Sequence, residues 1–283
     1  MPLHYTHGMA ASKPAEQVKA WPDPPPLLFR YTSLAWLEDI VKRSELFVPK
    51  PSSFNDPFDC RIFPDFAATP EEYRKHYALV LKDQPGSNRA ERRRELKRLR
   101  SVMDRSLYEE AFHKLLDDVA DTKGILCLSE IRNDILMWSH YADCHRGVCL
   151  MFDTRHEFFR PAWPVEYADE YPRVDFAGFT RMMGKMGAIG VAAEDAQREM
   201  IRTFFLTKSN HWCYESEWRV AKMTFGPYRM PPESLTGVIF GARVTPKRIE
   251  AAKLWIRQSP CKPTLLKAEV SQRAFSLEIR PLS

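Results

Sequence analysis

Two carboxylates and a guanidinium lie close together in the segment 212–220, which reads WCYESEWRV. If this segment is one β-strand, its side chains alternate between two faces, so the charged and the aromatic residues separate. One face then carries Cys213, Glu215, Glu217 and Arg219. Such a face can line a site that handles charge, or it can be a solvated surface held by ion pairs. The segment alone favours the solvated surface, so the other polar groups of the chain must decide.

Three polar side chains lie at the end of a predicted strand, LLFRY at 27–31, or directly after it. Arg30, Tyr31 and Thr32 come just before Ser33, which can cap a helix through Arg43. Functional groups often lie at such a strand end, where a loop or helix begins. A binding role for these side chains is one interpretation of this position, which by itself is a weak signal.

Two further segments combine polar residues with aromatic ones. In FNDPFD at 54–59, Asn55 and Asp56 precede a proline, which favours a turn. In MWSHYADCHRG at 137–147, Trp138 and Tyr141 have helical spacing, and Asn133 is the predicted cap of this helix. The simplest interpretation is a turn in the first segment and a core helix in the second.

A metal site is a further interpretation of the helix at 134–143. His140, Cys144 and His145 are neighbours there, and His211 and Cys213 could add ligands. Structural zinc sites, however, usually show paired short spacings of ligands, and here there is one cluster. We therefore predict no metal site.

The segment RAERRRELKRLR at 89–100 is dense in arginine. A charge run of this kind is usually the solvated face of a helix. Its basic residues outnumber its acids, so contacts with a phosphate backbone are the functional alternative. The candidate nucleic-acid contacts are Arg92, Arg93, Arg94 and Arg98. No aromatic residues interleave with them, so base stacking there is not expected.

Composition and motifs exclude several common classes of protein. The chain has 283 residues, 44% of them hydrophobic, and a formal net charge of +5. It has no apolar run long enough to span a membrane, no apolar core typical of an export signal, and six cysteines that suggest free thiols in a reducing cytoplasm. The glycine-rich nucleotide motifs, the G-x-S-x-G elbow and H-E-x-x-H are absent.

The organisation is that of an α+β domain. We expect an irregular leader at 1–26 and a single domain at 27–283, with helical insertions at about 71–121 and 174–206. Strands are predicted at 27–31, from 45, and at 122–130, 147–152, 163–167, 213–222, 236–241, 264–269 and 274–279. Helices are predicted at 34–43, 134–143 and 246–258. Strands occur early, centrally and late, without strict alternation with helices.

The order of these motifs resembles a bacterial family that is catalogued only as a domain of unknown function, numbered 2971. The motifs are FRYTS at 29–33, FNDPFD at 54–59, CLSE at 127–130, MWSHYAD at 137–143, HRG at 145–147 and YESEWR at 214–219. The resemblance covers about residues 27 to 222. It implies no activity.

A fainter resemblance is to the ADP-ribosyltransferases. Many of these enzymes carry an early Arg or His at a strand end, a middle Ser or Tyr element and a late E-x-E. Arg30 matches the first position, and Glu215 with Glu217 matches the last. The middle element is either Ser129 or the helix of Trp138 and Tyr141. The S-T-S triplet of one branch is absent, and a bulky tyrosine follows Arg30, which leaves the middle element open.

This second resemblance implies a split antiparallel β-sheet core and NAD as a co-substrate. Cleavage of the bond between nicotinamide and ribose passes through an oxocarbenium-like state. Glu217 would stabilise its positive charge, and Glu215 would orient or deprotonate the acceptor. The residues that would bind NAD are Arg30, Tyr31, Thr32, Asn55, Asp56, Ser129, Trp138 and Tyr141.

The favoured function is therefore NAD-dependent ADP-ribosyl transfer to a nucleic acid or a protein in the cytoplasm. A toxin or an anti-phage defence effector, with a neutralising antitoxin or an effector partner, would fit this activity. The alternatives are a protein that binds or processes nucleic acid without NAD, and a regulatory interaction module.

Overall fold

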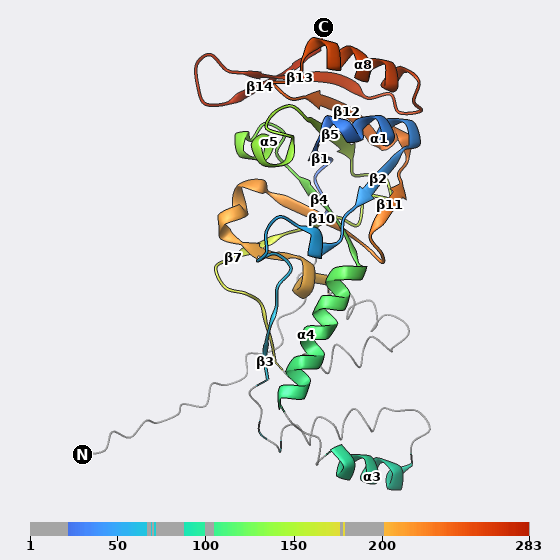
Figure 1. The fold of residues 1–283 in the computed structure, drawn as a ribbon, viewed down its shortest axis with the longest axis vertical. Helices are drawn as coiled ribbons and strands as arrows, with labels where there is room; N and C mark the ends of the chain where they lie inside the picture. Colours follow the sequence, from blue (N-terminus) through green and yellow to red (C-terminus); the bar gives the residue numbers. More distant parts are fainter. Residues whose placement is uncertain are drawn as a thin grey trace, which may run out of the picture.

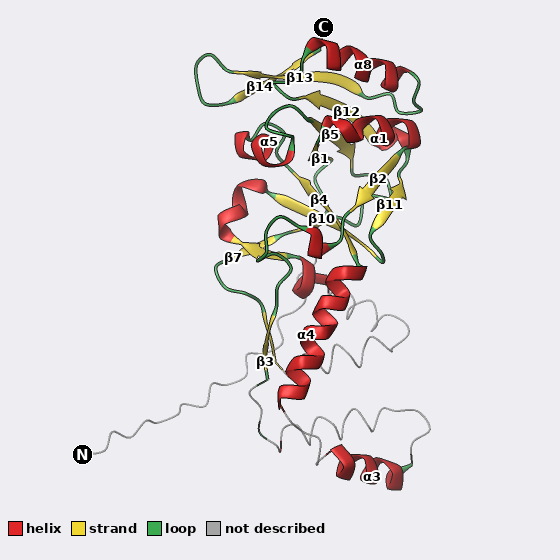
Figure 2. Cartoon of the chain, in the orientation of Figure 1, coloured by secondary structure: helices red, strands yellow, loops and turns green. Residues whose placement is uncertain are grey.

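The computed structural model describes residues 22–66, 69, 71, 88–99, 105–175, 178 and 201–282. These residues form a mixed α+β structure, as predicted, with one large sheet and several helices (Figure 1, Figure 2). Most of the leader expected at 1–26 lies outside the described residues. Much of the two expected helical insertions also lies outside them.

Eight strands form the main sheet, and all neighbours pair antiparallel except β12 and β13. In spatial order the strands are β14 (Leu277–Pro281), β13 (Thr264–Val270), β12 (Leu235–Phe240), β5 (Val148–Asp153), β1 (Leu27–Thr32), β4 (Gly124–Ser129), β10 (Glu217–Lys222) and β6 (Trp163–Pro164). Every residue of β5 is buried, because helices cover both of its faces. This explains its continuous apolar run.

The two faces of the sheet have different cores. Alternate residues of β5 and β12 pack against α1 (Leu37–Arg43) and α8 (Pro246–Arg257) on one face. The other residues of these strands pack against α5 (Ile135–Tyr141). Strand alternation therefore places α5 on the face opposite α1 and α8.

The sheet is interrupted between β1 and β4. These two strands pair only at Phe29 and Ser129, whereas β1 follows β5 through six pairs and β4 follows β10 through six. The two strands therefore diverge after one pair, and the sheet opens between them.

Three short two-stranded ladders lie outside the main sheet. They are β2 (Glu45–Val48) with β11 (Gly226–Arg229), β3 (Phe63–Asp65) with β8 (Arg173–Asp175), and β7 (Glu166–Ala168) with β9 (Thr207–Ser209). The last of these brings the segment at 207–209 next to the start of β10.

The arginine-rich segment is far from the main sheet. It forms α3 (Arg89–Leu99), which lies at the opposite end of the molecule from α8, β13 and β14 (Figure 1). Between them lies α4 (Arg105–Thr122), whose Phe112 ring packs edge-on against Phe66 at 5.4 Å.

The strand predicted at 213–222 is wrong in its first half. Residues Asn210–Glu215 form a 3-10 helix, which Ser209 caps by accepting a hydrogen bond from the amide of His211. Ser216 then adopts a left-handed conformation, with φ of 43°, and β10 begins only at Glu217. Glu215 and Glu217 therefore do not share a strand face, and Cys213 is exposed.

Of the two predicted helix caps, one is correct and the other is wrong by one residue. Ser33 accepts a hydrogen bond from the amide of Ala35, as expected, and begins a 3-10 turn that leads into α1. The cap of α5 is Asp134 rather than Asn133, since its Oδ1 accepts from the amides of Leu136 and Met137 at 2.8 and 2.9 Å.

This difference can be measured. Asp134→Ala should lower the free energy of unfolding by about 1 kcal/mol, because two amides of the first turn of α5 lose their acceptor. Asn133→Ala, one residue earlier and exposed, is the matched control and should change it by less than about 0.5 kcal/mol. Equal effects in urea denaturation would contradict the assignment of the cap.

Candidate functional site

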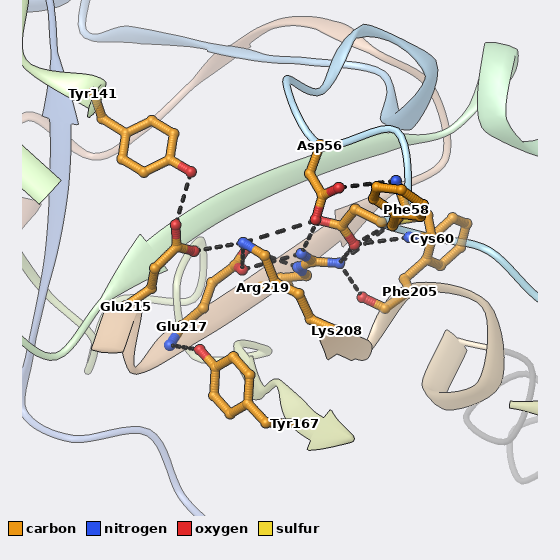
Figure 3. A network of polar contacts seen from close by, with 11 residues as sticks. Asp56, Phe58, Cys60, Tyr141, Tyr167, Phe205, Lys208, Glu215, Glu217 and Arg219 are labelled. Atoms are coloured by element: carbon orange, nitrogen blue, oxygen red, sulfur yellow. Dashed lines mark hydrogen bonds and ion pairs between the residues drawn. The ribbon is translucent and has the colours of Figure 1, made fainter. Parts of the chain in front are cut away.

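A buried cluster of charged residues lies where β9, β10 and the 54–62 loop meet (Figure 3). Its two cations are Lys208 on β9 and Arg219 on β10. Its three carboxylates are Asp59, Glu215 and Glu217, and each of the five residues is less than 10% exposed. Charges are buried in proteins only when they are paired and hydrogen-bonded. The contacts of this cluster meet that requirement.

Arg219 is the centre of one half of the cluster. Its guanidinium is fully buried and forms a forked pair with Asp59, at 2.9 Å from Nη1 to Oδ1 and 2.6 Å from Nη2 to Oδ2. Nε donates to Glu217 Oε1 at 2.7 Å, and Nη1 also donates to the carbonyl of Phe205 at 2.6 Å. The geometry is the planar, multiply bonded one that favours arginine over lysine.

Lys208 is the centre of the other half. Its ammonium donates to Glu217 Oε2 at 2.9 Å and to Glu215 Oε2. Its Nζ also lies 5.0 Å from the centre of the Trp212 ring. Burial alone would lower the pKa of Lys208, but the two glutamates raise it, so the side chain is protonated.

The two glutamates have opposite pKa shifts. Burial would raise the pKa of Glu217, but Arg219 and Lys208 lower it to about 2. Burial dominates at Glu215 and raises its pKa, although Lys208 opposes this and Tyr141 donates its hydroxyl to Oε1 at 2.7 Å. Two carboxylates with pKa values pushed apart can take different roles in acid–base chemistry.

A cavity of about 340 Å³ lies at the opening between β1 and β4. It collects side chains from five separate segments of the chain. Among the predicted site residues it is lined by Arg30, Tyr31, Asn55, Ser129, Tyr141, Glu215 and Glu217. We call it the sheet cavity. The structure therefore brings together seven of the ten residues that the sequence analysis selected for catalysis and NAD binding.

The contacts of three of these residues are mainly with the backbone. Arg30 donates to the carbonyl of Cys127 on β4 at 3.4 Å and to that of Phe47 on β2 at 3.3 Å. The hydroxyl of Tyr31 donates to the Ile131 carbonyl at 2.7 Å. Ser129 donates to the carbonyl of Glu215 at 2.6 Å and so holds the end of the 3-10 helix against β4.

Three predicted residues do not line the sheet cavity. Trp138 is fully buried in the core beneath α5, where its indole donates to the Arg132 carbonyl at 3.0 Å. It packs edge-on against Tyr31 at 5.3 Å, so it supports the cavity wall rather than reaching a ligand. Thr32 lies beyond the cavity on β1, and Asp56 lines a different cavity.

This other cavity has a volume of about 610 Å³ and shares Asn55 and Lys208 with the sheet cavity. We call it the outer cavity. Aromatic side chains contribute much of its wall, in particular those of Phe58, Tyr171 and Trp212. Because two residues line both cavities, a ligand in one would lie beside a ligand in the other.

Sequence reasoning missed Lys208 and Asp59. Asp59 is part of the FNDPFD motif and Arg219 part of YESEWR, so their occurrence in one set of motifs was a signal for pairing. Lys208 gave no such signal, because its position depends on the pairing of β7 with β9. Tyr167 on β7 was also missed, and its hydroxyl accepts from the Glu217 amide at 2.9 Å.

The candidate nucleic-acid contacts on α3 lie apart from both cavities (Figure 1). Arg93 and Arg94 are exposed, and the side chains of Arg92 and Arg98 lie outside the described residues. Within the described part of the chain, no group of three or more His, Cys, Asp or Glu side chains could hold a metal ion. No described helix is long and apolar enough to cross a membrane.

Comparison with known proteins agrees with one of the resemblances. Residues 137–220 match the model of a family described as a protein of unknown function (DUF2971). The matched segment includes Tyr141, Lys208 and both glutamates of the cluster, whereas Arg30 and Asp59 precede it. No curated protein and no solved structure matches the chain.

The charge cluster leads to a stability prediction. Asp59→Ala should lower the free energy of unfolding by about 3 kcal/mol, because it leaves the buried Arg219 without its forked partner. Asp39→Ala on α1 removes an exposed carboxylate that pairs weakly with Arg43 at 3.4 Å, and should leave stability nearly unchanged. If the two variants unfolded at a similar urea concentration, the pair of Asp59 with Arg219 would not contribute strongly to stability.

Proposed function

We propose that this chain, with its DUF2971 segment, is an NAD-dependent ADP-ribosyltransferase whose sheet cavity binds the nicotinamide end of NAD. The observation that carries the proposal is the convergence on one cavity of Arg30, Ser129, Glu215 and Glu217. These are the residues that match the early, middle and late elements of ADP-ribosyltransferases. They come from β1, β4, the end of the 3-10 helix and β10.

The shape of the sheet supports the same proposal. A split antiparallel core would open where two strands diverge, and β1 and β4 pair only at Phe29 and Ser129. The cavity at this opening, about 340 Å³, is near the lower end of the range for small-molecule sites. It would hold one half of a dinucleotide and leave the other half towards the outside.

Arg30 is suited to bind the part of NAD beyond nicotinamide. Its two backbone hydrogen bonds use one N–H from each terminal nitrogen. A guanidinium has five N–H donors, so others remain for a phosphate or a ribose hydroxyl. The rings of Tyr31 and Tyr141 line the same cavity and offer flat surfaces for nicotinamide.

The electrostatics of the cluster fit a cationic transition state. Three carboxylates and two cations leave one net negative charge when all are ionised. Glu217 stays ionised because its pKa is about 2, and its orientation is fixed by Arg219 and Lys208. A carboxylate fixed in this way stabilises developing positive charge on ribose without reorganisation of the site.

Glu215 has the complementary property in this scheme. Its raised pKa makes it the better proton acceptor of the two carboxylates. The bond between ribose and nicotinamide breaks with its electron pair on the nicotinamide nitrogen. The acceptor forms the new bond to the ribose carbon and releases one proton, which Glu215 can take.

The setting of this activity is proposed from the resemblance alone. A toxin or anti-phage effector in the cytoplasm would need a nucleic acid or protein acceptor, and a neutralising antitoxin or effector partner would control it. The second candidate function is nucleic-acid binding without NAD. The exposed Arg93 and Arg94 of α3 favour it, and steeply salt-dependent binding of nucleic acid without nicotinamide release would support it.

Glu217→Gln tests the proposed function. The variant keeps the size of the side chain but removes its charge, so nicotinamide release from NAD, measured by chromatography, should fall about 100-fold. Glu38→Gln on the exposed face of α1 is the control for a change of charge and should retain the wild-type rate.

Loss of folding would be a separate result, detected by circular dichroism. In that case Glu217→Asp, which keeps the charge but withdraws it by one methylene, replaces the first variant. Wild-type release by a folded Glu217 variant would contradict the role of this residue. No release by the wild-type protein with any acceptor would contradict the proposed function.

A further inference from the structure

The strand β14 forms one edge of the main sheet, at the end of the molecule opposite α3 (Figure 1). On its inner side it pairs with β13 in an antiparallel ladder. On its outer side no strand of the described part of the chain pairs with it. A free strand edge presents unpaired N–H and C=O groups, so it can pair with a strand of another chain.

The backbone groups of β14 that face inwards follow from the hydrogen bonds at the two ends of its ladder. Just before β14, the carbonyl of Ser276 accepts from the amide of Ser271 at 3.0 Å. Just after it, the amide of Leu282 donates to the carbonyl of Leu265 at 3.0 Å. The direction of these groups alternates along an antiparallel strand. The even-numbered residues of β14 therefore bond to β13, and the odd-numbered ones direct their backbone groups outwards.

The side chains of β14 carry opposite charges on the two sides of Ile279. Glu278 and Arg280 flank this residue, and their side chains are 44% and 61% exposed. The partner strand β13 places Glu269 directly opposite Glu278, and Lys267 directly opposite Arg280. Like charges directly opposite each other are unfavourable, although Arg280 compensates by contacting both glutamates. The inner neighbour of β14 therefore does not match its charges position by position.

A second, antiparallel copy of β14 does match these charges. If the two strands are centred on Ile279, Glu278 of each copy faces Arg280 of the other. Ile279 directs its backbone groups outwards, so it forms the hydrogen-bonded pair at the centre. The charged residues next to it then form non-hydrogen-bonded pairs, whose Cα atoms are about 4.5 Å apart and whose side chains lie closest. The segment is thus complementary to itself, which favours a second copy over an unrelated strand.

We propose that β14 joins two copies of this chain edge to edge, as antiparallel strands related by a two-fold axis at Ile279. The N–H group of Ile279 in each copy donates to the carbonyl of Ile279 in the other. The N–H group of Leu277 donates to the carbonyl of Pro281 in the second copy, a position where proline needs only to accept. The contact is closed, because it uses the same edge of both copies.

Two exposed apolar side chains lie at the start of β14. Phe275 is 101% exposed and Val270 is 71% exposed, the highest values among the large hydrophobic residues of the described part of the chain. Val270 lies directly opposite Leu277 on the ladder, and Phe275 lies two residues before it. In the antiparallel arrangement, the start of one β14 lies beside the end of the other. The second copy therefore approaches the part of the hairpin where apolar surface is most exposed.

The interface is independent of the proposed function. The strands β13, β12 and β5 separate β14 from β1 and from the opening of the sheet cavity. Glu278 and Arg280 do not line that cavity. Dimer formation can therefore be tested without NAD, and its failure would leave the proposed transferase untouched.

Sedimentation velocity at increasing protein concentration tests the interface. The wild-type protein should form dimers. Glu278→Arg and Arg280→Glu each turn both opposite-charge pairs into like-charge pairs, so each variant should raise the dissociation constant of the dimer about tenfold or more. Both side chains are exposed, and each change places an opposite charge across from β13. Circular dichroism should therefore show a retained fold.

The double variant with both changes is the matched control. It carries the same two substitutions but restores opposite charges between the copies, so it should dimerise like the wild type. An equimolar mixture of the two single variants should also form a dimer, because the charges of one variant complement those of the other.

Three results would overturn the interface. The first is a wild-type protein that remains monomeric at about 100 µM. The second is a dimer that neither single variant weakens, which places the contact on another surface. The third is a double variant that associates as weakly as the single variants, because the partner of the edge is then not a second β14. Recovery of the dimer in both the double variant and the mixture supports the interface.

Discussion

The structure depends on one buried guanidinium. Arg219 is fully enclosed, and its partners come from the 54–62 loop, from the segment at 205 and from its own strand. A buried charge must keep its partners, because losing one costs several kcal/mol. Arg219 therefore fixes Asp59 and Glu217 in position, and through Glu217 it fixes the ammonium of Lys208. The same contacts that join these segments also orient the carboxylates of the sheet cavity.

This arrangement links stability and chemistry in one cluster. The cations that compensate Glu217 also keep it ionised, whereas Glu215, at the edge of the cluster, has a pKa raised by burial. For the proposed transferase, a site built in this way would be preorganised, since its charges would not need to move as a cationic transition state formed. The opening of the sheet between β1 and β4 gives a small molecule access to these charges.

The sequence predicts the strands better than it predicts the site. The run GVCLMF at 147–152 is short and follows the glycine that ends the preceding helix. In that setting an apolar run without alternation favours a strand that is covered on both faces. The segment 210–216 was wrongly predicted as a strand because its polar and aromatic side chains alternate. Ser209 caps its start, and Ser216 ends it in a left-handed conformation, so the segment forms a 3-10 helix. Most candidate residues converge nevertheless, since they stand at the ends of neighbouring elements. Lys208 could not be predicted from the sequence, because only the pairing of β9 with β7 places it between the two glutamates.

Glu215 and Glu217 have pKa values on opposite sides of that of an ordinary glutamate, raised by burial at Glu215 and lowered by Arg219 and Lys208 at Glu217. This difference can be measured by carbon-13 NMR on protein labelled at the glutamate carboxyl carbons, with Glu215→Gln and Glu217→Gln used to assign the two signals. We expect Glu217 to be still ionised at about pH 3, below the usual pKa of a glutamate, and Glu215 to take up its proton above that pKa. Two ordinary titrations, or Glu217 protonating before Glu215 as the pH falls, would contradict this expectation.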